Sequence, residues 1–388
     1  MKVICDRSAL LEAVNAVSGA VASRTPRVQL TCAKLIATKS GKAGELALLA
    51  TDAELALKLI ISQVDVAQPG EALIPADKLR QIISAEEHDP TLTLETEGDT
   101  CHIRGTDAHF RVHGYPPADF PPIPDFETVV SGSAEVQKAK AVMTHPAGSL
   151  QALIGRTLFA TARENSRFAY SGVLFKRDGK RLELVATDGR RLALSRANLT
   201  GQAEKESKPV SCIVPTKALS MLLKLIGDPE EQVAIAITDN QIVFSLGGRA
   251  VLFSNLVEGA FPPYEDAIPR DQDKKVTFDR DVLASAVRRA AVLTNEESRG
   301  VRMSFSGKDK RLELASRAPE MGEAEIKVDV AAYEGTDIEI GFNPAFITDA
   351  LKVMNEPQVI MELKAPSKPA LIKSGQDFMY VVMPVALQ

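Results

Sequence analysis

The segment RLELVATDGRRLALSR, residues 181–196, decides how the rest of the chain is interpreted. Leucines recur at every second position before the pair Asp188-Gly189 and again after it (Leu182, Leu184, Leu192 and Leu194). Alternation with a period of two on both sides of Asp-Gly is typical of a β-hairpin with a type I′ turn, which needs positive φ at both central residues. The segment therefore predicts two antiparallel strands with one apolar face.

Relatives of this hairpin occur before and after it. ELALLATDAELALKL at 45–59 shares its ATD-x-x-LAL core, and RLELAS at 311–316 shares its first strand. A second marker, a strand followed by proline and an amphipathic helix, recurs around Pro75, Pro215 and Pro344, and proline is well tolerated in a first helical turn. A third marker, two alternating strands about a turn, recurs at 92–105, 233–248 and 359–375. A fourth, an opening helix, is expected near 9–22, 150–162 and 281–293.

Four markers in one order, three times over, predict an internal repeat of about 129 residues. We expect an α+β fold of three repeated domains at 1–127, 128–262 and 263–388. Each should hold two helices packed on antiparallel sheets of about seven or eight strands. The proline-rich stretches at 114–133 and 259–275 are expected to be stiff, extended connectors between domains.

Composition narrows the class of protein. Apolar residues make up 45% and charged residues 25% of the 388 residues, which is ordinary for a globular protein with a sizeable core. No apolar run approaches the length of a membrane span, so we expect a cytoplasmic protein without a membrane partner. The four cysteines, Cys5, Cys32, Cys101 and Cys212, form no C-x-x-C pair, which favours buried free thiols over disulfides or zinc ligands.

Catalytic and metal sites find little support in the sequence. Asp52 and Asp188 occupy equivalent turns, where a role in turn geometry is favoured over acid/base chemistry, although an enzyme that uses these turns stays an alternative. His102, His109 and His113 lie in one strand region, but no cysteine or acidic ligand accompanies them at a usual spacing. Phosphate-binding glycine motifs are absent. We predict no enzyme, no cofactor and no metal.

Cations on the predicted helices favour a binding function instead. Lysines and arginines recur on the opening helices and on the helices that follow the prolines, whereas the net charge of the whole chain is −5. A basic strip on an acidic body suits a polyanion held in a channel. Ordinary solvated helix faces are the alternative for any single residue. Because tryptophan is absent and aromatic residues make up only 5%, base stacking on single strands is disfavoured.

The chain resembles the bacterial DNA sliding clamp, the processivity (β) subunit of the replicative DNA polymerase III. The resemblance lies in the threefold repeat, ATDGRRLAL, FPPYEDAIP at 261–269, LTNEESRGVRM at 293–303, IGFN at 340–343 and YVVMPVAL at 380–387. It implies a head-to-tail homodimer that forms a ring around duplex DNA, independent of sequence, and that tethers partners without catalysis. The implied partners are the replicative polymerase catalytic subunit, the clamp loader and other clamp-binding proteins of replication and repair.

The resemblance also implies two sets of site residues. Four cations would contact DNA: Arg24, Lys78, Arg167 and Lys217. A hydrophobic peptide-binding pocket would be formed by Tyr170, Gly172, Thr187, Gly189, Arg190, Arg191, Leu192, Pro262, Asn343, Phe346, Val381, Val382, Met383, Pro384 and Val385. A trough lined by methionine and valine adapts to varied apolar side chains. Arg190, Ser298 and Ala386 differ from the residues that many relatives carry there, and they bear on which peptides the pocket prefers.

Ring closure would join an edge strand of the first domain to one of the third domain in the partner chain. The former is basic and the latter acidic, and apolar residues would lie between them. The predicted dimer interface comprises Arg104, Phe110, Arg111, Val112, Val292, Leu293, Glu323 and Glu325. A repeat scaffold that binds peptides but never DNA remains the alternative function.

Overall fold

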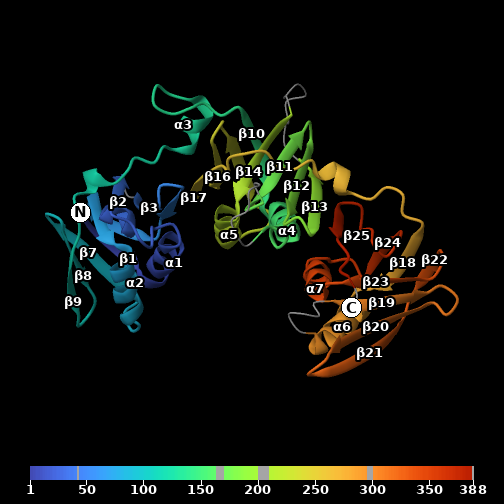
Figure 1. Cartoon of the computed structure of the whole chain (residues 1–388). Coiled ribbons are helices and arrows are strands. Elements are labelled where there is room, and N and C mark those ends of the chain that lie inside the picture. Colours follow the sequence, from blue (N-terminus) through green and yellow to red (C-terminus); the bar gives the residue numbers. More distant parts are fainter. Residues whose placement is uncertain (42, 163–169, 200–208, 295–299, 387–388) are drawn as a thin grey trace. The chain divides into compact units, whose positions relative to one another are not determined.

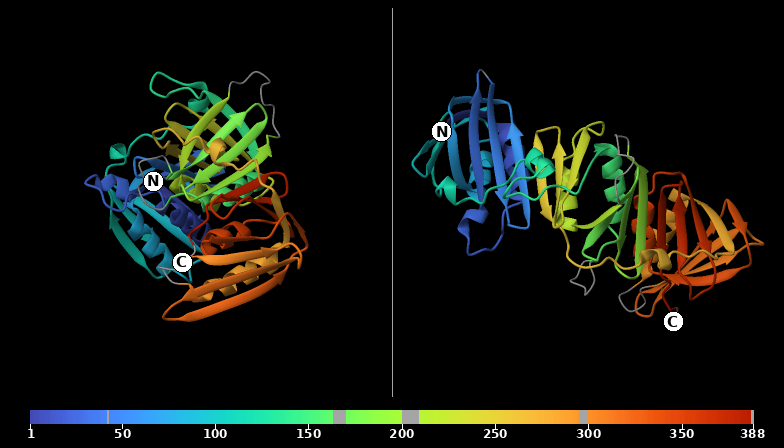
Figure 2. Two further views of the ribbon diagram at one scale, coloured as in Figure 1. Left: turned by 45° about the vertical axis from the view of Figure 1, so that its right-hand side comes forward. Right: turned by 90° about the horizontal axis from the view of Figure 1, so that it is seen from above.

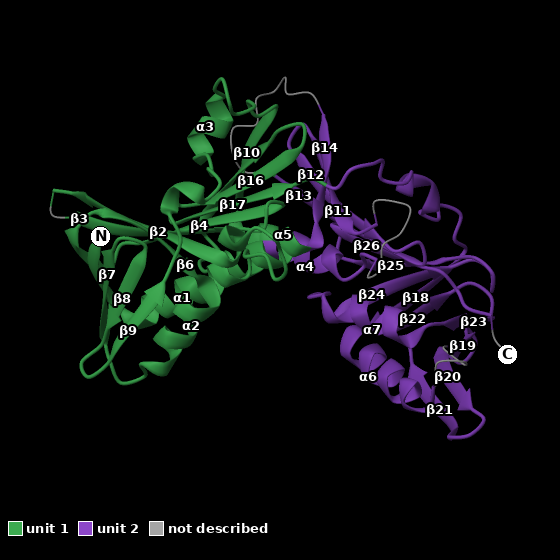
Figure 3. Ribbon diagram, turned by 60° about the vertical axis from the view of Figure 1, so that its left-hand side comes forward, with its two compact units in different colours: residues 1–150, 199–207, 217–256 green, residues 151–198, 208–216, 257–388 purple. Residues whose placement is uncertain are grey.

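A computed structural model of the chain describes residues 1–388 except 42, 163–169, 200–208, 295–299 and 387–388 (Figure 1). Its contacts divide the chain into two compact units (Figure 3). Unit 1 comprises residues 1–150, 199–207 and 217–256, and unit 2 comprises residues 151–198, 208–216 and 257–388. Each unit is described by itself, and the terms first, second and third repeat denote the three copies of the sequence markers.

Strands outnumber helices in every repeat, as the markers predict. The first repeat contains β1 (Lys2–Asp6), β2 (Cys32–Ser40), β3 (Ala43–Thr51), β4 (Leu55–Ile61), β5 (Val64–Gln68), β6 (Gly70–Pro75), β7 (Thr91–Glu97), β8 (Thr100–Arg104) and β9 (His109–His113). The second contains β10 (Ala141–Pro146), β11 (Gly172–Asp178), β12 (Arg181–Thr187), β13 (Arg191–Asn198), β14 (Val210–Pro215), β15 (Gln232–Ile237), β16 (Gln241–Leu246) and β17 (Ala250–Asn255). The third contains β18 (Lys274–Asp279), β19 (Val301–Ser306), β20 (Arg311–Ala318), β21 (Gly322–Asp329), β22 (Ala332–Glu334), β23 (Ile338–Phe342), β24 (Gln358–Leu363), β25 (Ala370–Ser374) and β26 (Phe378–Val382).

The opening helices begin one to three residues earlier than the sequence predicts. They are α1 (Arg7–Ser18), α4 (Ala147–Leu158) and α6 (Arg280–Ala290). Aspartates fix two of these starts, because the Asp6 carboxylate accepts the N–H of Ala9 and the Asp279 carboxylate accepts those of Asp281 and Val282. Such N-caps satisfy helix donors that otherwise have no partner.

The proline-linked helices are α2 (Ala76–Ala85), α5 (Thr216–Leu225) and α7 (Pro344–Lys352). Only Pro344 lies in the first helical turn, since Pro75 and Pro215 are the last residues of β6 and β14. Helices α1 and α2 pack against each other in unit 1, and α6 packs against α7 in unit 2. The left view of Figure 2 shows the long orange strands β20 and β21 lying against α6.

The strands form four antiparallel sheets. Unit 1 contains the order β5-β1-β7-β8-β9 and the order β10-β15-β16-β17-β4-β3-β2-β6, which joins four strands of the second repeat to four of the first. Unit 2 contains β14-β11-β12-β13-β26-β25-β24-β18-β22 and β21-β20-β19-β23. Two of the sheets therefore continue from one repeat into the next.

The hairpin β12–β13 differs from its prediction in two ways. Of the two turn residues, only Gly189 has positive φ (84°), so the type I′ expectation for Asp188-Gly189 is wrong. The Asp188 carboxylate accepts the N–H groups of Arg190 and Arg191 at 2.9 and 3.0 Å, which closes a longer turn. The turn in the first repeat is built alike, with Ala53 at φ 77° and Asp52 as the acceptor. In addition, consecutive residues 182–187 of β12 and 191–195 of β13 are buried, so both faces are covered and not one.

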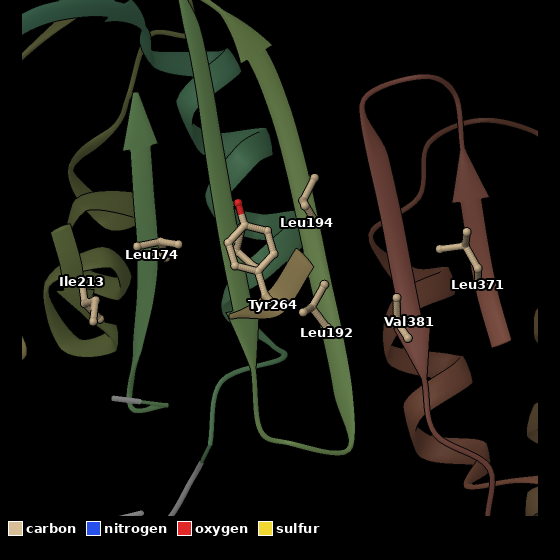
Figure 4. Close-up of a cluster of buried hydrophobic side chains, with 8 residues drawn as sticks. Leu174, Leu192, Leu194, Ile213, Tyr264, Leu371 and Val381 are labelled. Atoms are coloured by element: carbon tan, nitrogen blue, oxygen red, sulfur yellow. The ribbon is translucent and has the colours of Figure 1, made fainter. Parts of the chain in front are cut away.

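The connectors cover the second face of these sheets. The short helix α3 (Phe126–Ser131) and single 3-10 turns at Pro117–Asp119 and Tyr264–Ala267 lie where extended chain was expected. Phe120 packs on Cys32, Leu49 and Leu73 in unit 1. In unit 2, Tyr264 packs on an apolar cluster that spans the second and third repeats: Leu174, Val185, Leu192, Leu194, Ile213, Leu371 and Val381 (Figure 4).

Candidate functional site

Unit 2 brings the hairpin turn, the end of β26 and the start of α7 together. The N–H of Met383 donates to the carbonyl of Arg190 at 2.9 Å, and the N–H of Val385 donates to the carbonyl of Gly341 at 2.9 Å. These two bonds hold the tail beyond β26 against the turn on one side and against the end of β23 on the other. Tyr170 lies beside the turn, with its ring about 3.8 Å from where a Cβ on Gly189 would be.

Arg191 is the buried centre of this region, and its side chain is only 5% exposed. Its guanidinium donates to Asp188 at 3.0 Å, to Asp349 of α7 at 2.9 Å and to the carbonyl of Phe159 at 2.9 Å. The same group lies over the ring of Phe346, 4.5 Å from its centroid. Arginine can satisfy several acceptors at once because its donors form a planar fork. The second-repeat hairpin is thereby fastened to the first two turns of the third-repeat helix α7.

The predicted pocket residues fall into two groups by exposure. Those that reach the surface are Tyr170, Gly189, Arg190, Pro262, Asn343, Phe346, Met383, Pro384 and Val385. Those that are buried are Gly172, Thr187, Arg191, Leu192, Val381 and Val382. The buried group lies within β11, β12, β13 and β26, and its role as a pocket wall stays a prediction. Met383 is the exposed large apolar side chain of the described tail, at 44% exposed.

The equivalent place in the first repeat is built differently. There the N–H of Asn255, the last residue of β17, donates to the carbonyl of Glu54 at 2.8 Å, just as Met383 does to Arg190. Lys217, two residues after Pro215, forms an ion pair with Asp52, whereas Phe346, two residues after Pro344, stacks against Arg191. An ion pair therefore occupies the position at which unit 2 has an aromatic ring.

Three of the four predicted DNA contacts are exposed cations of unit 1. Arg24 is exposed between α1 and the next turn, and Lys78 is exposed on α2. Lys217 is also exposed, but Asp52 already neutralises part of its charge. Arg167 lies outside the described residues.

The predicted dimer residues lie on β8, on the edge strands β9 and β21, and on the 3-10 turn Ala291–Leu293. Arg104 and Arg111 are exposed on β8 and β9, and Glu323 and Glu325 are exposed on β21. Val292 is 69% exposed, and Leu293 lies near Gly322 at the start of β21. Val112 is only 8% exposed, so it belongs to the core of its own sheet and its side chain offers little surface to a partner. Phe110 is half-buried.

The three histidines do not converge on one point. The Nδ1 atom of His102 and the Nε2 atom of His109 are 2.9 Å apart and their rings are stacked, whereas His113 faces Thr100 at 3.4 Å. Among the described residues, one group of three ligand side chains could surround a metal ion: Glu86, Asp89 and Asp107. Thr106 already donates twice to Asp89.

One polar network was not anticipated from the sequence. The Tyr264 hydroxyl donates to Glu183, which also accepts from Arg196 at 2.6 Å, and Lys176 reaches both Tyr264 at 3.3 Å and Glu265 at 3.0 Å. This network fastens the second connector to β11–β13. The only sequence signal was a tyrosine within a proline-rich stretch, and its partners are about 80 residues away.

Comparison with known proteins identifies the family. Three family models match in order: the N-terminal domain of the DNA polymerase III beta subunit at 1–124, its central domain at 145–263 and its C-terminal domain at 265–386. The chain is 32% identical over 383 residues to the beta sliding clamp of Pseudomonas putida, covering 98% of each, and 31% identical over 389 residues to that of Escherichia coli K12, covering 100% of each.

Solved structures agree with the sequence matches. A Pseudomonas aeruginosa sliding clamp bound to griselimycin superposes with a TM-score of 0.90 at 32% identity, and a Bacillus subtilis clamp with 0.89 at 26%, each covering 100% of both chains. None of the described helices is long and apolar enough to cross a membrane. The repeat, the shared hairpins and the full-length matches together show that the chain belongs to the beta sliding clamp family, the beta subunits of DNA polymerase III.

Proposed function

We propose that two copies of this chain close head to tail into a ring that encircles duplex DNA and tethers the replicative polymerase. The observation that carries the proposal is the strand pairing that joins one repeat to the next. The second strand of each hairpin pairs with the last strand of the following repeat, so that β4 pairs with β17 and β13 pairs with β26. The third hairpin ends in β21 and the first repeat ends in β9, and both are edge strands in the described chain.

Two unpaired edge strands with opposite charge can pair with the same strands of a second copy. Edge β9 presents Arg111 beside Arg104 of β8, and edge β21 presents Glu323 and Glu325. Val292, an exposed apolar residue near the start of β21, would pack beside Phe110. When β9 of one copy pairs with β21 of a second copy, β21 of the first and β9 of the second stay free. These two strands can form the same pairing, which closes a dimer with two identical seams.

The helices supply the surface for DNA. Arg24 and Lys78 are exposed cations of unit 1, and phosphate contacts from such residues are independent of sequence and sensitive to salt. Weak contacts suffice here, because a closed ring holds DNA by topology and still slides. The proposed function therefore involves no catalytic step.

The tail and hairpin turn of unit 2 form the proposed docking site for partners. Met383, Pro384 and Val385 present apolar side chains on a backbone that two hydrogen bonds keep extended. Such a surface suits an extended peptide with apolar anchors. The expected ligands are peptide segments of the replicative polymerase catalytic subunit, the clamp loader and other proteins of replication and repair. Tethering to a ring raises the effective concentration of each partner at the DNA.

Topological trapping tests the proposal. The chain is loaded by a clamp loader onto nicked circular plasmid, and the DNA-bound fraction is separated by gel filtration before and after the circle is cut. A clamp stays on the circle and leaves the linear form. Retention that is equal on both, or absent from both, would instead favour direct adhesion or the protein-only scaffold.

Two variants assign the parts of this function. Phe110→Asp should convert the dimer to a monomer in light scattering, because it places a charge at the centre of the proposed seam. Arg24→Glu combined with Lys78→Glu should leave the dimer intact and reduce retention in low salt. Lys217→Glu is a less clear test, because it would also place two carboxylates together at Asp52.

A further inference from the structure

The sheets of all three repeats share one register, which fixes how the proposed seam must align. A row of directly opposed residues crosses each repeat and ends on its last strand at Phe110, Leu252 or Tyr380. The rows are Val3, Leu94, Ile103 and Phe110, then Met143, Ile235, Phe244 and Leu252, then Val276, Met361, Ile372 and Tyr380. These three end residues are therefore structurally equivalent.

The hairpins have an equivalent position of their own. At the two junctions within the chain, Leu252 lies opposite Leu57 and Tyr380 lies opposite Ala193. Within the second-repeat hairpin, Ala193 pairs with Ala186, which is the second residue after RLEL. The second residue after RLEL in the third repeat is Ser316, and it pairs with Ala324. Ala324 is therefore the third-repeat equivalent of Ala193. Following the same register, Phe110 lies opposite Ala324 of a second copy.

This alignment sets the neighbours on the outer face of the seam. One step along the antiparallel strands, Arg111 lies opposite the partner's Glu323, and His109 lies opposite the partner's Glu325. At the junction of the second and third repeats the same two places hold the apolar pairs Leu192 with Val381 and Leu194 with Met379. Charged pairs thus replace apolar pairs at the one junction where both strands are exposed to water before association.

We propose that His109 is a proton-dependent latch of the ring: in its charged form it pairs with Glu325 of the partner subunit and tightens the seam. This inference rests on the proposed dimer. Such a latch requires a histidine whose charged neighbours are cations in the single chain and include carboxylates in the dimer. The groups around His109 meet that requirement.

In the single chain, the neighbours of His109 oppose its protonation. Desolvation lowers its pKa first, and the charges of Arg104, His102 and Arg111 lower it further. Arg104 lies directly opposite on β8, and the His102 ring is within hydrogen-bonding distance. The nearest carboxylates on that face are occupied or distant, since Glu95 pairs with Lys2 and Arg104, and Glu97 lies 3.6 Å from the far nitrogen of His102. His113 points to Thr100.

Across the seam, β21 brings carboxylates to His109. Glu325 would face it, Glu323 would face Arg111, and Lys327 offsets part of this charge because it pairs with Glu325 at 2.9 Å. An opposing carboxylate favours the imidazolium, so association should raise the pKa of His109 and take up a proton. A group whose pKa rises on association strengthens it at low pH, and this contribution is lost as the pH rises through the raised value.

The dissociation constant of the full-length dimer tests the latch. Sedimentation velocity at constant ionic strength, at about pH 6 and about pH 8, should give a dimer roughly tenfold tighter at the lower pH, that is, about threefold for each of two seams. His109→Gln and Glu325→Gln should each abolish this pH dependence. The matched control is His113→Gln, on the same strand face, which the register places opposite Met321 and which should retain the dependence.

Each outcome decides a different point. A stable dimer whose dissociation constant is the same at both pH values would overturn the latch and leave the ring. Absence of a dimer at either pH would overturn the proposed function itself. The register has its own check by disulfide trapping: Arg111→Cys with Glu323→Cys should crosslink two chains readily, and Arg111→Cys with Glu325→Cys should not. Equal crosslinking would refute the alignment. The four native cysteines are buried and would not compete.

Discussion

Replacing Arg191 by alanine should destabilise unit 2 without removing any exposed binding group. The guanidinium holds Asp188, Asp349 and the carbonyl of Phe159, and it stacks on Phe346. Alanine would leave two carboxylates without their partner inside a closely packed region. Breaking a buried ion pair in this way costs about 3–5 kcal/mol.

The lower end of that range applies here. The side chains of Asp188 and Asp349 are 17% and 28% exposed, so water can partly replace the lost donors. Lys352 also stays within 3.6 Å of Asp349. We therefore expect a loss of about 3 kcal/mol, which lowers the Tm of a folding unit of this size by about 6–12 °C.

Differential scanning calorimetry of the full chain measures this effect, and the neighbouring residue supplies the control. Arg190 is exposed, and its side chain makes no ion pair with the described residues, so Arg190→Ala should change stability by less than about 0.5 kcal/mol. Arg191→Lys keeps the charge but not the fork and should lie between the two. If Arg191→Ala had the same Tm as Arg190→Ala, the buried network would not be what fastens the hairpin to α7.

Three further predictions concern other parts of the chain. Met383→Asp should weaken binding of a fluorescent clamp-binding peptide at least about tenfold in an anisotropy titration, with unchanged circular dichroism, because it charges a large apolar side chain of the tail that is exposed. Unchanged affinity would move the docking site elsewhere. Tyr264→Phe should cost about 1–2 kcal/mol in urea unfolding, since it removes a donor from Glu183; burial, then that carboxylate, raises the pKa of the phenol, so the effect should persist into alkaline solution. Burial raises the pKa of the Cys5 and Cys101 thiols to about 12, so both should resist alkylation near pH 8 until urea unfolds the chain, as mass spectrometry can follow; rapid labelling of the folded protein would contradict their burial.

The sequence was most informative where structure follows from local pattern. Alternating leucines in 181–196 predict β12 and β13, and the repeated markers predict the order of helices and strands in each repeat, because side-chain direction in a strand or helix depends on spacing alone. Of the residues proposed for the candidate sites, Met383, Arg24 and Lys78 are exposed, and their roles stay predictions. The family itself was predicted correctly from the quoted motifs.

Tertiary structure decided what depends on residues far apart in the chain. The sequence of 181–196 indicates one apolar face, yet both faces are buried, because a connector about 80 residues later covers the second. Adjacent arginines cannot be told apart by spacing, but Asp349 and Phe346 bury Arg191 and leave Arg190 exposed. Likewise, the sequence does not distinguish Lys217 from other cations on helices, because its partner Asp52 is brought beside it only by folding. The sequence alone determined the repeating unit, since local periodicity encodes it, whereas long-range strand pairing determined which turn is fastened, which cation is neutralised and which edges, β9 and β21, stay unpaired in the described chain.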